Sequence, residues 1–335
     1  MTPPVPPGVP AGGAPLRLRG RTFGPGRPVV MAIVNRTTDS FYPGARHDDD
    51  AGALDAVARA VDEGADIVDI GGVRAGRGEP VDVAEEVRRV VPLVERVRSR
   101  HPELLVSVDT WRAPVARAAV AAGADLLNDT WAGHDPDLVG VAAAGGVGVV
   151  CSHTGGAIPR TDPFRVAYAS ADPGRRPALD ASGTDAFGTD ASRAGTAARP
   201  DPRDGVLTDV LATLGVAAAR AVDLGVDPAS VLVDPTHDFG KNTWHSLHLL
   251  RRTEALVALG YPVLLALSRK DFVGETLGLP VDDRLEGTLA ATAVAAWLGA
   301  RVFRTHDVRA TRRTLDMVAA VRGDAAPARA VRGLA

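Results

Sequence analysis

The chain has 335 residues, 45% of them hydrophobic, which is enough for one large core, and its formal net charge is −3. Because no basic block stands out, we expect no nucleic-acid partner. The single cysteine, Cys151, excludes an internal disulfide, fits a reducing cytoplasm and is predicted to be a buried thiol. No apolar run reaches the roughly 18 residues of a membrane span, and the N-terminus lacks the pattern of a secretory signal. We therefore expect a cytoplasmic protein without a membrane partner.

Two stretches contain too few large apolar residues to offset the entropy that is lost on ordering. One is the Pro-, Gly- and Ala-rich start, residues 1–20, which we interpret as a flexible tail. The other, residues 169–204, is predicted to be a flexible insertion. Residues 324–335 are interpreted as a C-terminal tail, and residues 21–323 are predicted to form a single domain.

Eight short apolar runs alternate with Ala-, Val-, Arg- and Glu-rich stretches of helical spacing, and this alternation is typical of a TIM (β/α)8 barrel. The insertion would then interrupt the fifth βα loop. We expect strands at about 29–35, 66–71, 104–109, 125–129, 147–152, 231–234, 262–267 and 301–305. We expect helices at about 50–63, 82–99, 113–122, 136–144, 205–224, 245–259, 283–298 and 308–322.

Glycines and alternating residues punctuate this pattern. Five glycines that each follow a helical run are predicted to take the left-handed conformation that ends a helix: Gly64, Gly123, Gly225, Gly260 and Gly299. The repeat Gly-Ala-Asp at residues 64–66 and 123–125 is interpreted as a structural helix-to-strand connection. Ahead of the first strand, alternating residues predict a small hairpin that turns at residues 24–26 and plugs the bottom of the barrel.

Almost every apolar run ends in a polar residue, and in this fold the carboxyl ends of the strands meet at one face. Asp109, Asn128 and Asp234 are therefore expected to lie close together. Carboxylates in that position can accept hydrogen bonds from ring N–H groups, bind a metal or offset a developing cation. The alternative for either carboxylate alone is a cap on the following helix.

Basic residues close the last two strands. Ser268-Arg269-Lys270 indicates an anionic or carbonyl-bearing ligand, with a solvated basic turn as the alternative. Arg304 and His306 lie two residues apart, so they would point to the same side and can grip one phosphate. The alternative there is an ion pair with Asp307. Phe239-Gly240-Lys241 is compatible with a phosphate loop or with a surface lysine.

The first two βα loops also carry polar or flexible residues. The first begins at Asn35, and an Asn and an Asp among hydroxyls suit contact with Mg²⁺ and phosphate. The acidic run at residues 47–50 is interpreted as the first turn of a helix rather than as a metal cluster. The glycines of the second loop, residues 71–79, either let the backbone approach a ligand or provide flexibility alone.

Seven motifs follow one another between about residues 31 and 321: MAIVNRTTDSF, VDIGG, SVDTWR, LLNDT, VDP with FGK, SRKDFVGETLG and RTHDV. Together they resemble dihydropteroate synthase, the pterin-binding enzyme of folate synthesis. The resemblance implies a transferase that joins 6-hydroxymethyl-7,8-dihydropterin diphosphate to 4-aminobenzoate and releases diphosphate. It implies a pterin site of Asp109, Asn128, Asp234 and Lys270, with Asp109 and Lys270 as the catalytic residues. It also implies a diphosphate site of Asn35, Arg304 and His306, with Asn35 meeting a Mg²⁺ cofactor.

The second-substrate side departs from the family pattern. In the family's second loop a Thr stands at Ala75, and the Ser that follows Ser-Arg-Lys is Asp271 here, whose charge would repel the carboxylate of 4-aminobenzoate. The family's Met-His-Met-Gln-Gly becomes residues 152–156, without the Met that packs against the pterin. Its Gly-Ile-Gly-Phe-Gly-Lys becomes residues 236–241, which read Thr-His-Asp-Phe-Gly-Lys.

These departures resemble a divergent second-copy branch of the family and leave three hypotheses open. The chain is a working synthase with remodelled loops, a pterin- or diphosphate-binding paralogue with little or no activity, or a related transferase with a different, cationic acceptor. The resemblance further implies a homodimer. The small-residue, largely apolar helix at 283–298 fits a buried or subunit-facing position.

Overall fold

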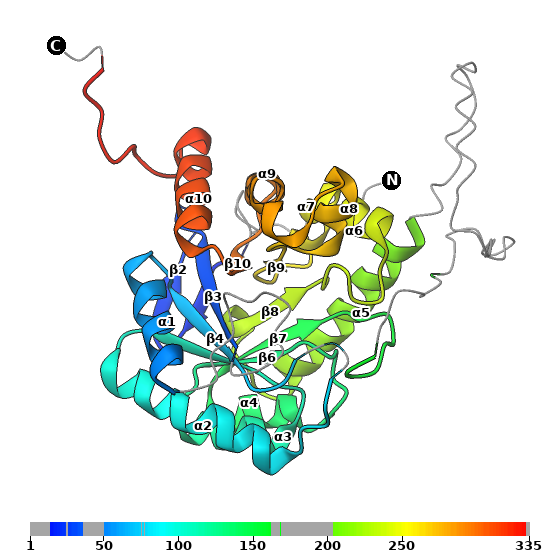
Figure 1. Ribbon diagram of the computed structural model, residues 1–335. Helices are drawn as coiled ribbons and strands as arrows, with labels where there is room; N and C mark the ends of the chain where they lie inside the picture. The colour runs from blue at the N-terminus through cyan, green and yellow to red at the C-terminus, as the bar shows by residue number, and fades with distance from the viewer. Residues whose placement is uncertain are drawn as a thin grey trace, which may run out of the picture.

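The computed structural model describes residues 14–24, 26–35, 50–74, 76, 78–161, 168 and 204–332. Within them, eight parallel strands form a barrel surrounded by helices (Figure 1), and the predicted fold class is confirmed. The barrel strands are β3 (Val29–Asn35), β4 (Ile67–Gly71), β5 (Leu105–Asp109), β6 (Leu126–Asp129), β7 (Gly148–Ser152), β8 (Val231–Asp234), β9 (Leu264–Ala266) and β10 (Val302–Thr305). They pair in the order β8-β7-β6-β5-β4-β3-β10-β9, and a bridge between Val233 and Val263 closes the ring.

The described helices alternate with these strands along most of the chain. They are α1 (Asp50–Asp62), α2 (Val83–Arg100), α3 (Ala113–Ala121), α4 (Leu138–Gly145), α5 (Asp204–Asp223), α6 (Thr243–Arg251), α7 (Thr253–Val257), α8 (Asp271–Leu277), α9 (Leu285–Trp297) and α10 (Val308–Arg322). Two short 3-10 helices, η2 (Pro228–Ser230) and η3 (Val281–Asp283), precede β8 and α9. The helix predicted at 245–259 is in fact two helices, because Arg252 leaves helical geometry between α6 and α7. The motif that contains Asp271 forms α8, which was not predicted.

A hairpin precedes the barrel, as expected, but it turns earlier than predicted. Strands β1 (Leu16–Leu18) and β2 (Arg21–Phe23) pair antiparallel. Arg19 and Gly20 connect them with φ of +47° and +72°, and two successive positive φ values are typical of the tight hairpin turn that matches strand twist. The turn therefore lies at residues 19–20 and not at 24–26, and β1 lies inside the range 1–20 that composition assigned to a tail.

The side chains that point into the barrel form a closed apolar layer at its bottom. Leu16, Leu18 and Phe23 of the hairpin pack against one inward residue from nearly every strand, so the hairpin does plug the barrel. The strand residues of this layer are Val29, Met31, Ile67, Leu105, Leu126, Val150, Leu232, Leu264 and Val302. Since side chains alternate along a strand, the next inward positions lie above this layer, toward the carboxyl ends.

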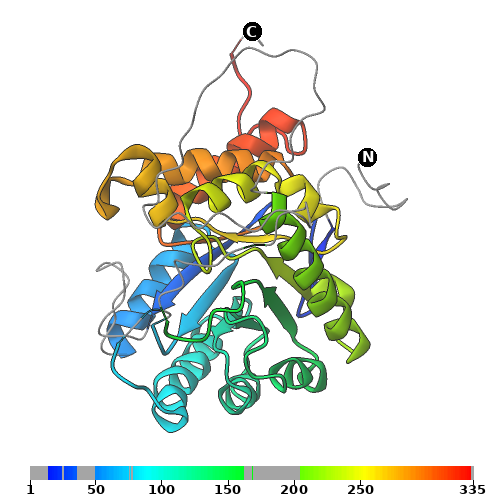
Figure 2. The ribbon, with the colours of Figure 1, turned by 90° about the vertical axis from the view of Figure 1, so that its right-hand side faces the viewer.

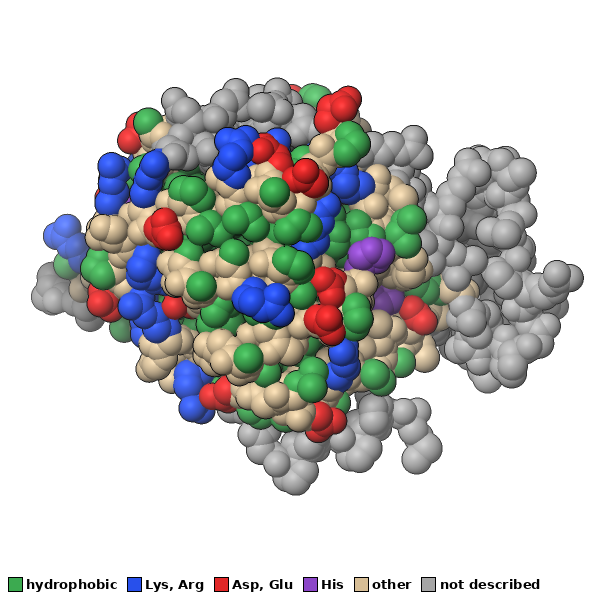
Figure 3. All heavy atoms as spheres, turned by 90° about the horizontal axis from the view of Figure 1, so that it is seen from below, with side chains coloured by type: hydrophobic (Ala, Val, Ile, Leu, Met, Phe, Trp, Pro, Cys, Tyr) green, Lys and Arg blue, Asp and Glu red, His purple; other side chains and the backbone are tan. Residues whose placement is uncertain are grey.

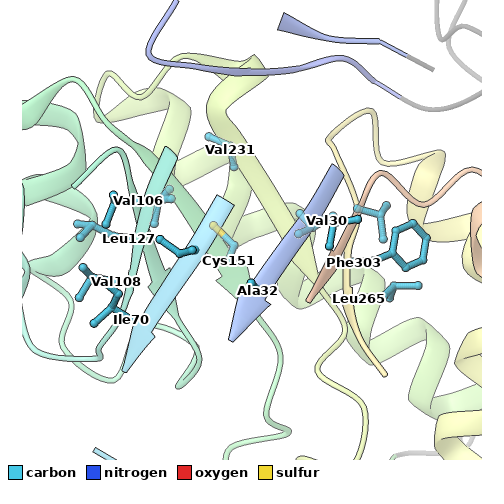
Figure 4. Close-up of a cluster of buried hydrophobic side chains, with 14 of the residues drawn as sticks. Val30, Ala32, Ile70, Val106, Val108, Leu127, Cys151, Val231, Leu265 and Phe303 are labelled. Carbon is cyan, nitrogen blue, oxygen red and sulfur yellow. The ribbon is translucent and has the colours of Figure 1, made fainter. Parts of the chain in front are cut away.

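The outward side chains of the same strands form the second part of the core, beneath the helices. Figure 4 shows several of them, including Val30, Ala32, Ile70 and Phe303. Cys151 belongs to this cluster, so the predicted buried thiol is confirmed. Burial raises the pKa of this thiol to about 12, because the thiolate would have no water around it.

The five glycines predicted to end helices all have positive φ, between +84° at Gly260 and +106° at Gly123 and Gly225. The Asp that follows two of them has a structural role at the bottom of the barrel. Asp66 accepts a hydrogen bond from the Val30 amide at 3.0 Å, and Asp125 accepts one from the Val106 amide at 2.9 Å. Each carboxylate thus links the helix-to-strand connection in which it lies to the preceding strand of the barrel. This is the structural role that was predicted for the Gly-Ala-Asp repeat.

Two surface features complete the description. One helix within the described residues, Gly205–Asp223, has the length and hydropathy of a membrane span, and 39% of its apolar stretch is buried in the protein. It lies along the outside of the barrel in Figure 2 and contacts β7 and β8, so one side of it packs on the barrel. On the face in Figure 3, positive and negative side chains are interspersed. On α2, Glu85 forms ion pairs with Arg88 and with Arg89, each at 2.6 Å.

Candidate active site

Strand register brings the predicted polar residues together. Asp69 lies opposite Ser107, Asp109 opposite Asn128, and Ser152 opposite Asp234. All stand an even number of residues from an apolar side chain of the bottom layer, so they share the inward face above that layer. The barrel mouth is therefore lined by polar groups, while Asp129, one residue after Asn128, points outward and caps the following turn.

Arg304 is the centre of this arrangement. Its Nε donates to Asp69 Oδ2 at 2.6 Å, and its Nη2 donates to Asp109 Oδ2 at 2.9 Å. Asp109 also accepts a hydrogen bond from the Thr130 hydroxyl at 2.8 Å. The ion pair expected as the alternative, with Asp307, forms instead with Arg269, which contacts both of its oxygens at 2.9 and 3.0 Å.

Asp69, the Asp of the VDIGG motif, belongs to the site although the sequence motifs did not assign it there. It is fully buried and accepts three hydrogen bonds, from Ser107 Oγ at 2.6 Å, Asn128 Nδ2 at 3.1 Å and Arg304 Nε at 2.6 Å. These contacts fix the amide of Asn128 and the guanidinium of Arg304. The signal was present in the sequence, because a carboxylate at an inward position of an apolar strand requires partners.

Electrostatics at the mouth are dominated by burial. Burial raises the pKa of Asp109 to about 7, although Arg304 acts in the opposite direction. It also raises the pKa of Asp234, which accepts the Thr236 amide at 2.7 Å. Burial thus weakens the charged form of both carboxylates at the mouth, and the guanidinium of Arg304 opposes this effect.

The two lysines of the chain, Lys241 and Lys270, have different positions. Lys270 immediately precedes α8, donates to the His237 carbonyl, and lies 5.2 Å from the centre of the Phe239 ring. Lys241 is 2% exposed, and its Nζ donates to the carbonyls of His153 at 2.8 Å, Phe239 at 2.9 Å and Thr236 at 3.3 Å. It is therefore not a surface lysine. Its ammonium donates hydrogen bonds to backbone carbonyls in the loop after β7 and in the loop after β8.

The remaining predicted residues lie around this centre. His306 follows β10, its amide donates to Ser268 Oγ at 3.2 Å, and burial lowers its pKa to about 4, so its imidazole is neutral at pH 7. Asp271 opens α8 and pairs with Arg284 Nη1 at 2.8 Å. Asn35 ends β3 beside Gly71 of β4. Ala75 and the loop at 36–49 lie outside the described residues.

A resident metal would find few protein ligands here. The described part of the chain has no group of three His, Cys, Asp or Glu side chains that could hold an ion. Asn35 offers one amide oxygen at the end of β3. Mg²⁺ commonly binds through one or two protein oxygens with substrate phosphates and water completing its shell, and this donor set fits only such a shared site.

The barrel, its polar mouth and the comparisons define the class of protein. Residues 31–306 match the family of pterin binding enzymes, and the chain belongs to that family. Similar proteins include dihydropteroate synthases and inactive dihydropteroate synthases. The chain is 54% identical to inactive dihydropteroate synthase 2 of Mycobacterium tuberculosis over 318 residues, 95% of this chain and 90% of the relative. It is 34% identical to dihydropteroate synthase of Bacillus subtilis over 296 residues, 88% of each protein.

Solved structures agree with this assignment. A Yersinia pestis dihydropteroate synthase with a sulfonamide drug complex superposes with a TM-score of 0.77 at 31% identity, covering 93% of this chain and all of that one. A Xanthomonas albilineans dihydropteroate synthase with 4-aminobenzoic acid gives 0.72 at 35% identity, covering 92% of this chain and 98% of that one. The resemblance inferred from the seven motifs is confirmed.

Proposed function

We propose that this chain binds a dihydropterin diphosphate at the mouth of the barrel and condenses it with 4-aminobenzoate slowly or not at all. The observation that carries the proposal is a contrast between two sides of the mouth. Asp109, Asn128 and Asp234 share one inward face with Arg304, and Lys270 is close enough to Asp234 for their charges to interact. Asp271, which stands where the family pattern has the Ser that neighbours the aminobenzoate carboxylate, carries a carboxylate at the start of α8.

The ligand would compete with Arg304 for Asp109. A ring N–H of the pterin can donate to the Asp109 oxygen that now accepts Arg304 Nη2, while Arg304 stays anchored to Asp69 through Nε. The released end of the guanidinium would then meet the diphosphate, for which a planar fork is well suited. Asn35 and His306 would contribute neutral polar contacts. Mg²⁺, held by Asn35 and the diphosphate, would offset the charge of the leaving group.

The acceptor side supports weak or absent synthase activity. In the acceptor position that the family pattern implies, the carboxylate of Asp271 would lie near the carboxylate of 4-aminobenzoate and repel it. Asp271 already forms an ion pair with Arg284, which partly offsets its negative charge. Because this cation already occupies the carboxylate, the structure gives little support to a cationic acceptor. The similarity to a relative named an inactive dihydropteroate synthase favours the paralogue hypothesis over a working synthase.

Calorimetric titration of the protein with the pterin diphosphate and Mg²⁺, followed by 4-aminobenzoate, tests both halves. We expect binding of the pterin diphosphate and little diphosphate release. Asp271→Ser should increase the affinity for 4-aminobenzoate, whereas the matched removal of an exposed charge, Asp283→Ser, should not. Rapid diphosphate release by the parent protein would refute the second half of the proposal, and absent pterin binding would refute the first.

We also propose that the chain forms a homodimer in the cytoplasm through α9 and α10, which pack side by side. Exposed apolar side chains on these helices are Val294, Trp297, Met317 and Val321. A second copy with the same patch would remove them from water. Sedimentation should give a dimer for the parent and a monomer for Trp297→Glu, while Val216→Glu on α5 should remain dimeric. A monomeric parent would overturn this proposal.

A further inference from the structure

The loop that follows β8 has a strained backbone. Thr236 and Asp238 have φ of +51° and +68°, in the left-handed region that glycine enters freely and other residues enter at a cost. A β-branched threonine is particularly unsuited to it. Such a conformation persists where the surroundings determine it, so the contacts of these two side chains need an explanation.

Asp238 joins the loop to two helices. Its Oδ1 accepts a hydrogen bond from Ser246 Oγ of α6 at 3.1 Å. Its Oδ2 accepts one from the backbone N–H of Phe272, the second residue of α8, at 3.2 Å. A carboxylate that accepts an otherwise unpaired N–H of the first helical turn stabilises that end of the helix. Glycine at position 238 would relieve the backbone but could make neither contact.

The same loop contacts α8 at one further point and also contacts the residue before it. The His237 carbonyl accepts a hydrogen bond from Lys270 Nζ, and the His237 ring lies 5.7 Å from the ring of Phe272. Lys270 is the residue directly before α8, so Asp238 and His237 together fix both the backbone and the ammonium of this lysine.

Charge supports the same arrangement. The surrounding protein lowers the pKa of Lys270, and Arg304 of β10 acts in the same direction. Three carboxylates oppose this and favour the charged ammonium, with Asp238 first, then Asp234 of β8, then Asp271 of α8. Asp238 therefore acts on Lys270 both through geometry and through charge.

We propose that Asp238 is a positioning residue that clamps the loop after β8 to α8 and holds the Lys270 ammonium at the barrel mouth. The inference rests on the proposed function, in which Lys270 faces the pterin. Asp238 acts through Lys270 and does not itself need to contact the ligand.

The lysine content of the chain allows a direct test without ligand. Lys241 and Lys270 are its only lysines, so protein labelled with ¹³C at lysine Cε gives two side-chain signals, which Lys270→Arg assigns. Asp238→Asn keeps the size and the tolerance of positive φ but removes the charge. We expect it to lower the pKa of Lys270, because the carboxylate that most favours the charged ammonium is gone, and Ser246→Ala to leave that pKa unchanged. Equal Lys270 titrations in the parent and in Asp238→Asn would overturn the clamp.

Asp238→Gly separates positioning from folding. It removes backbone strain, so we expect unfolding temperature to be preserved or increased, while affinity for the pterin diphosphate falls about tenfold. Parent-like affinity in this variant would contradict the clamp. If the parent itself fails to bind the pterin diphosphate, the proposed function fails, and the ligand-free titration of Lys270 still decides the role of Asp238.

Discussion

Replacing Asp69 with alanine tests the organisation of the barrel mouth most directly. The side chain is fully buried and accepts hydrogen bonds from Ser107, Asn128 and Arg304. Removing one partner of a buried ion pair typically costs about 3–5 kcal/mol, because the other charge stays buried without compensation. Since Arg304 keeps Asp109 through Nη2, we expect the lower end, about 3 kcal/mol of unfolding free energy.

A double-mutant cycle in urea denaturation isolates the pair. Asp69→Ala, Arg304→Met and the double variant should give a coupling energy of about 2 kcal/mol, because the second substitution costs little once the first partner is gone. Ser107→Ala provides the matched control, since it removes a neutral partner of Asp69 and should cost only about 1 kcal/mol. Additive effects of the two charge substitutions, within about 0.5 kcal/mol, would refute the role assigned to this pair.

Three further predictions concern the core and the loops. Burial lowers the pKa of His153 to about 4, so this imidazole stays neutral in the folded protein and binds a proton on unfolding below about pH 6.5. The free energy of unfolding should therefore decrease as the pH is lowered from 7 toward 4. Relative to His153→Gln, the parent should lose about 3 kcal/mol between pH 7 and pH 4 in urea titrations, and a constant difference would contradict this assignment. Cys151 should resist an aromatic disulfide reagent at pH 8 until urea is added, and rapid native labelling would show that it is accessible. Gly225→Ala should cost about 1 kcal/mol through φ alone, since no atom lies within 4 Å of the added Cβ, and an unchanged urea midpoint would exclude backbone strain there.

Much of the fold was accessible from local patterns. Apolar runs of strand length, helical spacing and glycines at helix ends are short-range properties, and they placed all eight barrel strands. The hairpin turn was assigned wrongly because Gly-Pro-Gly is a stronger local turn signal than Arg19-Gly20. Tertiary packing of Leu18 and Phe23 under the barrel decided the register instead. Helix α8 was missed because seven residues carry little periodic signal.

The candidate site was predictable in part for the same reason. Period-two alternation places Asp109, Asn128 and Arg304 on one face, so their proximity follows from sequence once the barrel is assumed. Partner choice does not follow. Arg269 and Arg304 are similar in sequence context, yet Arg269 pairs with Asp307, and Arg304 reaches Asp69 and Asp109 across the barrel.

The sequence by itself therefore determined the elements, the family and the residues that face the mouth, because those depend on spacing along one chain. Only the tertiary structure decided which charges meet. It made Asp69 an anchor for Arg304, placed the Lys241 ammonium among backbone carbonyls, and made Asp238 a link from the loop after β8 to α6 and α8. These roles depend on distances between segments up to 235 residues apart, as between Asp69 and Arg304, and such distances are set by the closure of the barrel.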